Sequence, residues 1–109
     1  MRDTGRYILD ANSNPVKVDS LDEWARWYEK NHNKRHVGLT KFEGDIRVST
    51  VFLALDHNFD YGPPILYETM VFGGEYNGEQ ERYSTRAEAL KGHMRWVQKV
   101  KDTGAKPDD

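Results

Sequence analysis

The chain has 109 residues, a length that suits one domain, and a chain of this size buries roughly 60 to 70% of the surface that its unfolded form exposes. Its 16 Lys and Arg residues against 18 Asp and Glu residues give a formal charge of −2, which provides no overall field that would attract nucleic acid or an anionic membrane. The absence of Cys excludes disulfides, thiolate catalysis and cysteine-based zinc or iron–sulfur sites.

The sequence contains no candidate membrane segment. No stretch approaches the ~20 apolar residues that a spanning helix needs, and the opening residues MRDTGRYILD include no apolar run of signal-peptide length. We therefore expect a cytoplasmic protein without membrane contact. Three Trp, six Tyr and four Phe residues predict a core rich in aromatic side chains.

The N-terminal part predicts a small hairpin followed by a helix. Short apolar stretches within residues 7–18 flank a segment rich in Asn, Ser and Pro, which favour a turn. Ser20 and Glu23 have the spacing of a capping box, and apolar residues then recur at helical intervals. The pattern predicts a helix from Leu21 to Lys30.

The middle of the chain predicts an antiparallel meander of about four strands. Residues 37–42 alternate in polarity and end at a turn with Gly44, after which 46–55 form a β-branched run that is apolar on both faces in its second half. This run suits a central strand. Residues 65–72 predict the next strand, and the polar stretch 80–83 predicts an edge strand.

The C-terminal part predicts a second helix and a tail. Thr85 and Glu88 repeat the capping-box spacing, and an apolar stripe indicates a helix from Thr85 to Lys101. Residues 102–109 have no apolar anchor, which predicts a disordered tail behind a single domain of residues 1–101. The expected fold is α+β, with the hairpin, the meander and two helices packed on one face of the sheet.

The segment after the central strand is the first candidate site, because polar residues at a strand end often carry function. His57 is a candidate general base, which Asp56 or Glu68 would orient. In the alternative interpretation, Asp56 and Asn58 satisfy backbone groups of a turn and His57 lies at the surface. The predicted binding residues of this loop are Asp56, His57, Asn58, Phe59 and Tyr61.

Two further ionisable residues are candidates with a structural alternative. Glu68 lies on a predicted strand and is either a buried functional acid or a residue of an exposed sheet face. His93 follows Gly92 beside the apolar stripe of the second helix, and we favour a hydrogen-bonded histidine at the edge of the core. The catalytic candidates are therefore His57, Asp56, Glu68 and His93.

A metal site and a nucleic-acid site receive weaker support. His32 and His36 are spaced by four residues, yet the segment between them lacks the Glu of a zinc-binding HExxH motif and carries two cations. We predict no metal and no cofactor. Trp27 lies off the apolar line of the first helix, so it is either a core-edge residue or an exposed anchor for a partner, and stacking of a single strand on this helix is a third possibility.

Three blocks of the sequence resemble a family of small uncharacterised proteins of bacteriophages and prophages. The blocks are RVSTVFLALDHNF (Arg47 to Phe59), GPPILYETMVFGG (Gly62 to Gly74) and ERYSTRAEALKGH (Glu81 to His93), joined by WARWYE (Trp24 to Glu29). Asp60-Tyr61-Gly62 departs from the glycine-richer loop of the relatives. The resemblance implies expression in the cytoplasm of a bacterial host and an accessory role, without an activity.

The sequence therefore favours a non-enzymatic protein that binds a host protein or a small ligand through residues 56–64, in counter-defence or host modulation. A small metal-dependent or acid–base hydrolase and a single-stranded nucleic-acid binder are the alternatives, with nucleic acid the less expected partner. Edge strands and spare aromatic residues also make a homodimer plausible.

Overall fold

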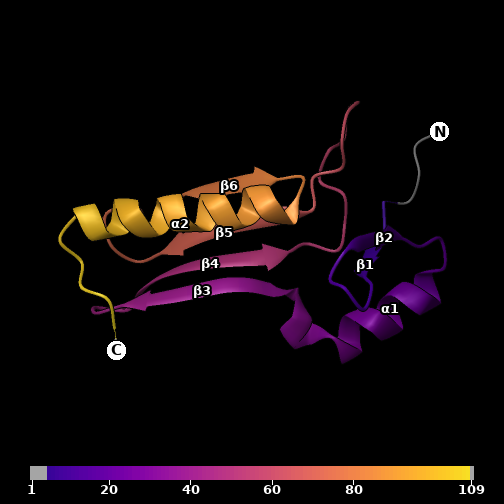
Figure 1. The fold of residues 1–109 in the computed structure, drawn as a ribbon, viewed down its shortest axis with the longest axis horizontal. Helices are drawn as coiled ribbons and strands as arrows, with labels where there is room; N and C mark the ends of the chain where they lie inside the picture. The colour runs from indigo at the N-terminus through magenta and orange to yellow at the C-terminus, as the bar shows by residue number, and fades with distance from the viewer. Residues whose placement is uncertain (1–4, 109) are drawn as a thin grey trace.

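The computed structural model describes residues 5–108, and its two helices and six strands form the predicted α+β fold (Figure 1). In chain order the elements are β1 (Tyr7–Leu9), β2 (Pro15–Lys17), α1 (Leu21–Lys30), a 3₁₀ helix (His32–Arg35), β3 (His36–Phe42), β4 (Ile46–Phe52), β5 (Tyr67–Phe72), β6 (Gln80–Tyr83) and α2 (Arg86–Asp102). No helix in this part of the chain is long and apolar enough to cross a membrane.

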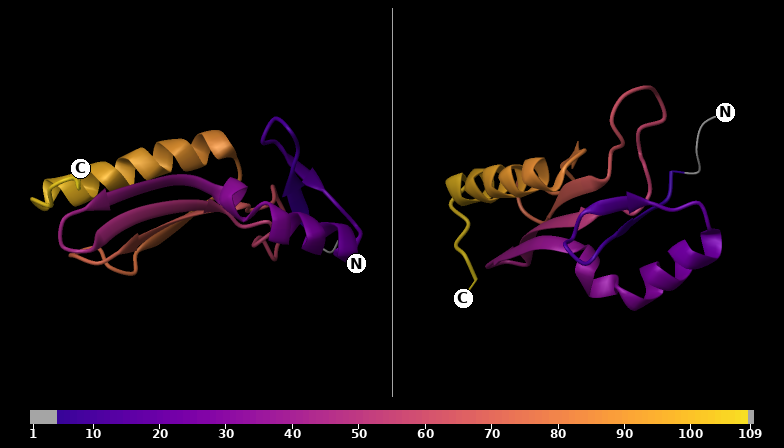
Figure 2. Two further views of the ribbon diagram at one scale, coloured as in Figure 1. Left: turned by 90° about the horizontal axis from the view of Figure 1, so that it is seen from below. Right: turned by 45° about the vertical axis from the view of Figure 1, so that its right-hand side comes forward.

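Strands β3 to β6 form the predicted antiparallel meander in the order β3-β4-β5-β6. The register pairs Thr50 of β4 with Thr69 of β5, and the alternation of buried and less buried residues follows from it. Val48, Thr50 and Phe52 of β4 lie on the buried face. The opposite face has no helix over it (Figure 2).

Helix α2 lies along the buried face of the sheet and contacts all four strands (Figure 1). It begins after Thr85, whose side chain accepts the amide of Glu88, while the Glu88 carboxylate accepts the Thr85 amide at 3.1 Å. The predicted capping box is therefore present. Ala89, His93, Val97 and Val100 are buried at helical spacing, which brings one side of the helix onto the sheet.

Helix α1 and the β1–β2 hairpin pack at the end of the sheet where β4 ends (Figures 1 and 2). Ser20 caps α1 through the amide of Glu23, as expected. The Trp27 ring meets the ring of Phe52 edge to face at 6.0 Å, and Phe52 belongs to the face that α2 covers. Both helices thus pack on the sheet, α2 along its length and α1 at one end.

The buried face holds two apolar clusters with a polar layer between them. The cluster under the C-terminal half of α2, here the helix cluster, consists of Phe42, Val48, Val71, Trp96, Val97 and Val100. The cluster at the other end, here the hairpin cluster, consists of Leu9, Phe52, Ala54, Leu66, Tyr67, Tyr83 and Ala89. The polar layer between them consists of Thr40, Thr50, Thr69 and His93. Thr50 lies between Val48 and Phe52 along β4, so the layer follows from the strand alternation.

Strand β4 ends at Phe52, three residues before the predicted Leu55. Ala54 has φ 65°, a left-handed conformation that a non-glycine residue rarely adopts and that stops the strand. Its carbonyl accepts the Tyr7 amide at 2.9 Å and the Trp24 indole N–H at 3.0 Å. The turn at Ala54 therefore ties the sheet to both the hairpin and α1.

The C-terminal tail differs from the sequence prediction of disorder. Pro107 forms a β-bridge with Phe42, the Glu43 amide donates to the Lys106 carbonyl at 2.9 Å, and the Asp108 amide donates to the Lys41 carbonyl at 3.0 Å. Backbone hydrogen bonds to the free edge of β3 hold this segment, and composition alone does not reveal them.

Candidate functional site

The loop between β4 and β5 carries most of the predicted site residues and projects from the end of the sheet (Figure 2). The chain leaves the sheet at Ala54 and returns at Leu66, whose amide donates to the Tyr83 carbonyl at 3.0 Å. The His57 amide donates to the Ile65 carbonyl at 2.9 Å, so the base of the loop is closed by backbone pairing.

Asp56 and Asn58 brace the loop from inside. Oδ1 of Asp56 accepts the amides of Asn58 at 2.8 Å and Ile65 at 2.9 Å. The Asn58 amide group donates to the Pro63 carbonyl at 2.8 Å, and its Oδ1 accepts the Asp60 amide at 3.0 Å. These bonds match the turn interpretation of the two residues, and they hold the loop in one shape without help from a ligand.

His57 is half-buried, and its Nδ1 lies 2.8 Å from the Leu55 carbonyl oxygen. Because a carbonyl only accepts, Nδ1 carries the proton and Nε2 is the nitrogen that remains to accept one. A general base of this kind works best when a carboxylate holds its proton-bearing nitrogen, and here a backbone carbonyl has that position.

Glu68 lies on the face of the sheet that α2 does not cover. Its Oε2 accepts Nε of Arg82 at 3.0 Å across the β5–β6 pair, and these two residues are register partners. The position fits the exposed-face interpretation of Glu68. The carboxylate that the sequence offered as a partner for His57 is thus ion-paired with Arg82 instead.

His93 is buried in the polar layer. Its Nε2 lies 2.9 Å from Oγ1 of Thr40, and its Nδ1 lies 2.7 Å from Oγ1 of Thr50. Burial lowers the pKa of the imidazole, so the neutral form is favoured in the folded protein. Both ring nitrogens are hydrogen-bonded, which agrees with a structural histidine at the helix–sheet contact.

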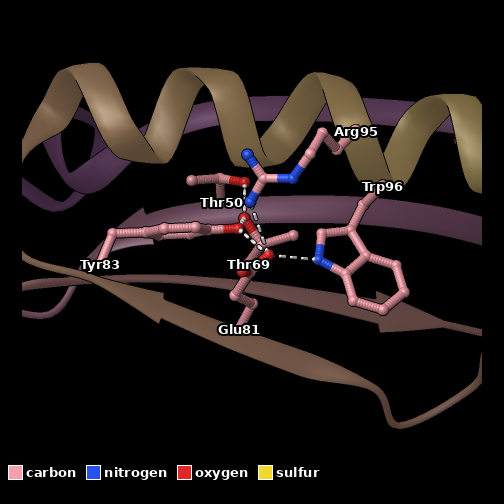
Figure 3. A network of polar contacts seen from close by, with 6 residues as sticks. All are labelled: Thr50, Thr69, Glu81, Tyr83, Arg95 and Trp96. Atoms are coloured by element: carbon pink, nitrogen blue, oxygen red, sulfur yellow. Dashed lines mark hydrogen bonds and ion pairs between the residues drawn. The ribbon is translucent and has the colours of Figure 1, made fainter.

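The polar layer continues to the surface through residues that the sequence analysis did not single out (Figure 3). Oγ1 of Thr50 lies 2.6 Å from Oγ1 of Thr69, and the Tyr83 hydroxyl lies 3.0 Å from Thr69 and 3.1 Å from Oε1 of Glu81. The pairing register brings these groups together from separate strands. The one signal in the sequence was the run of polar residues in the middle of otherwise apolar strands.

Glu81 ends this chain of contacts with one oxygen that accepts several donors. Arg95 and the indole N–H of Trp96 each reach Oε1 at 3.0 Å, in addition to the Tyr83 hydroxyl. Burial raises the pKa of the Glu81 carboxyl, but the bonds from Trp96, Arg95 and Tyr83 outweigh burial and the pKa is lowered. Glu81 therefore stays ionised and fixes α2 to the edge strand β6.

The aromatic residues among the predicted binding residues divide into two groups. Phe59 is 85% exposed and Tyr61 is 98% exposed, both on the braced loop. Trp27 is half-buried against Phe52, which matches its core-edge interpretation. Large exposed apolar side chains often mark the surface that contacts a partner protein.

The structure assembles no metal site from the residues that it describes. His32 and His36 face each other with ring centroids 5.9 Å apart, yet no group of three or more His, Cys, Asp or Glu side chains in residues 5–108 is arranged to hold an ion. A metal site with two histidines normally needs further ligands.

A cleft of about 410 Å³ lies beside the base of the loop. It lies between the β1–β2 hairpin, the end of the loop and the first turn of α2. The residues that line it, here the proline cleft, are Tyr7, Ser13, Asn14, Pro15, Pro63, Pro64, Leu66, Ser84, Thr85 and Arg86. The loop and the cleft together form the surface with most features of a binding site at this end of the molecule.

Comparisons of this chain with protein-family models, with curated proteins and with solved structures find no match.

Proposed function

We propose that this chain is a non-enzymatic binding protein that recognises a partner protein through the loop of residues 56–64, with Phe59 and Tyr61 as its anchors. The resemblance of its sequence blocks to phage proteins suggests a partner in the bacterial host and an accessory role such as counter-defence or host modulation. The observation that carries the proposal is the exposure of two aromatic rings on a loop that its own polar groups cross-link by hydrogen bonds.

Rigidity is what makes these rings suitable anchors. Aromatic residues dominate the energetic centres of protein interfaces, and a surface that is ordered before binding loses less conformational entropy when the partner arrives. Asp56 and Asn58 supply this order through hydrogen bonds within the loop, two by the Asp56 side chain and three by the Asn58 side chain. Their polar groups are used in the loop, so the rings are left as its main contact surface.

The hydrolase alternative has less support. Its four candidate side chains make separate contacts. His57 contacts a backbone carbonyl and Asp56 the amides of Asn58 and Ile65. Glu68 pairs with Arg82, and His93 contacts two threonines. An acid–base pair needs its members within hydrogen-bond reach of one another or of a shared substrate atom.

The nucleic-acid alternative through α1 also has less support. The indole N–H of Trp24 donates to the Ala54 carbonyl, and the Arg35 guanidinium lies over the Tyr28 ring at 4.1 Å. Base stacking needs free aromatic faces, and these contacts use the surfaces that α1 would have offered.

The proposal is tested by placing a photo-crosslinking amino acid at Phe59 or Tyr61 and irradiating the tagged protein in extract of its bacterial host. We expect one defined crosslinked partner from both positions. Met94 is 63% exposed on α2 and provides the matched control position, from which we expect no such product. A partner crosslinked from Met94 and from neither loop position would contradict the proposal.

The affinity for the same partner then measures the contribution of Phe59 and Tyr61. Because truncating an anchor residue typically costs 2 kcal/mol or more, we expect Phe59→Ser with Tyr61→Ser to weaken binding by about 30-fold or more. Leu90→Ser with Met94→Ser removes two exposed apolar side chains elsewhere and is expected to leave affinity unchanged. Equal losses of affinity in the two double variants would contradict the assignment of the loop as the contact surface.

A further inference from the structure

Three segments of the chain contribute apolar residues to the proline cleft. Pro15 comes from the hairpin, Pro63 and Pro64 from the end of the loop, and Leu66 from the chain as it enters β5. Pyrrolidine rings and a leucine side chain offer no hydrogen bonds, so water beside them is poorly held, while Ser13, Asn14, Ser84 and Thr85 supply the polar part of the lining. An apolar group of matching size gains free energy by displacing this poorly held water, and about 410 Å³ is within the usual range for a small-molecule site.

Arg86 gives the cleft a single charge. Among residues 5–108 its guanidinium has no hydrogen-bond or ion-pair partner, and it is exposed where α2 begins. The nearest acid in the sequence, Glu88, uses its carboxylate to cap the Thr85 amide and hydroxyl. The residues that line the cleft include no Asp or Glu. The cleft therefore favours an anionic group over a cationic one.

Tyr67 adds unused hydrogen-bonding capacity in the same region. Its hydroxyl is buried and has no hydrogen-bond partner in the described part of the chain. Burial raises the pKa of this hydroxyl, and the nearby charge of Arg86 opposes the shift. A buried hydroxyl that lacks a hydrogen-bond partner is costly in a folded protein without a compensating role.

A second cleft at the far end of the sheet lacks this selectivity. It measures about 520 Å³ and is lined by Lys41 and Arg47 but also by Asp45 and Asp108. Two cations and two carboxylates leave no net charge to choose a ligand. The proline cleft has one cation and no carboxylate, so it alone of the two predicts the charge of its ligand.

We propose that the proline cleft is a binding site for a small carboxylic acid with an apolar body, whose ring or chain lies between the prolines and Leu66 and whose carboxylate pairs with Arg86. This site is separate from the Phe59 and Tyr61 anchors and does not depend on the proposed protein partner. Guanidinium groups bind carboxylates in a planar, two-point geometry, which gives the site its directionality.

The test titrates the full chain with 3-phenylpropionate as the probe. Binding is measured by the changes in the backbone amide chemical shifts. We expect the shifts to concentrate at Leu66 and Thr85, and the uncharged 3-phenylpropanamide to bind about tenfold more weakly, because a hydrogen bond to a charged group contributes about 1.5 kcal/mol or more. Equal affinity for acid and amide, or shifts centred on Arg47, would overturn the proposal.

Two variants complete the test. Arg86→Gln is exposed and is expected to fold normally while removing the difference between acid and amide. Arg47→Gln makes the same change at the far end of the sheet and is the matched control, expected to leave probe binding intact. The variant with both loop anchors replaced by Ser should still bind 3-phenylpropionate, so loss of partner binding and loss of this site are separable. Retention of the acid preference in Arg86→Gln would refute the assigned pairing.

Discussion

At one end of the sheet, a single helix lays Trp96, Val97 and Val100 on β-strand residues, and the helix cluster is closed by continuous secondary structure. At the other end, the hairpin, α1, the loop and the first turn of α2 meet around the hairpin cluster (Figure 2). The braced loop and the proline cleft both lie at the second end. Binding surfaces commonly occur where several segments meet, because each segment can vary without loss of the scaffold.

The polar layer joins these two ends and depends on a close approach of α2 to β6. A Cβ atom at position 92 would lie 2.1 Å from the Tyr83 hydroxyl oxygen and 2.3 Å from its Cζ. Only glycine allows this contact. This contact explains why position 92 is glycine, although glycine in a helix interior lowers stability by about 1 kcal/mol relative to Ala.

The largest effect is expected for Gly92→Ala. The added methyl group must push Tyr83 away from Thr69 and Glu81, so we expect the free energy of unfolding to fall by about 2 to 3 kcal/mol in urea titrations. Helix propensity alone predicts that the free energy of unfolding rises by about 1 kcal/mol. The sign of the measured change therefore distinguishes a clash with Tyr83 from an effect of helix propensity. Lys91→Ala on the exposed side of α2 is the control, with a change within about 0.5 kcal/mol.

A smaller effect is expected for Trp24→Phe at the hairpin end. The substitution removes the indole N–H that donates to the Ala54 carbonyl, but this carbonyl keeps the bond from the Tyr7 amide. Because the acceptor is not left unsatisfied, we expect a loss of about 1 kcal/mol by urea unfolding. Trp27→Phe, which alters only ring packing on Phe52, is the comparison. A loss of 3 kcal/mol or more would show that the two ends are equally dependent on single contacts.

The smallest effect is expected from pH. The pKa of His93 is lowered in the folded state, so the unfolded chain binds the proton more readily. The stability contributed by neutral His93 is complete above the unfolded pKa of about 6.5 and is lost progressively as pH falls below it. We expect the urea midpoint of the wild type to fall more steeply between pH 7 and 5 than that of His93→Gln. Parallel curves would contradict this account of the polar layer.

The sequence was sufficient for the local elements of the fold. Ser20 and Thr85 cap the starts of the observed helices as predicted, although only Thr85 forms the full reciprocal capping box, and strand β6 has the predicted bounds. These features depend on neighbouring residues, whose spacing is visible in a single chain. The end of β4 was predicted three residues too far along the chain, because the left-handed backbone conformation of Ala54 is not expected for alanine.

The site was less accessible from sequence because its contacts are long-range. Polarity correctly indicated the loop as a distinct segment, but the exposure of Phe59 and Tyr61 depends on how Asp56 and Asn58 fold it. Arg86 and Pro15 are far apart in sequence and meet only because the hairpin and α2 pack at the same end. No local pattern encodes such a meeting.

The segment that runs from α2 back to β3 bears on how the molecule behaves at high concentration. A seven-residue outer strand with free amides and carbonyls invites strands of other molecules to add to it, which is a common route to aggregation. Lys106 and Asp108 engage the backbone of Glu43 and Lys41, and Pro107 cannot donate a hydrogen bond outward. The last residues of the described chain thus cover the outer edge of the sheet at residues 41–43 and hinder the addition of another strand there.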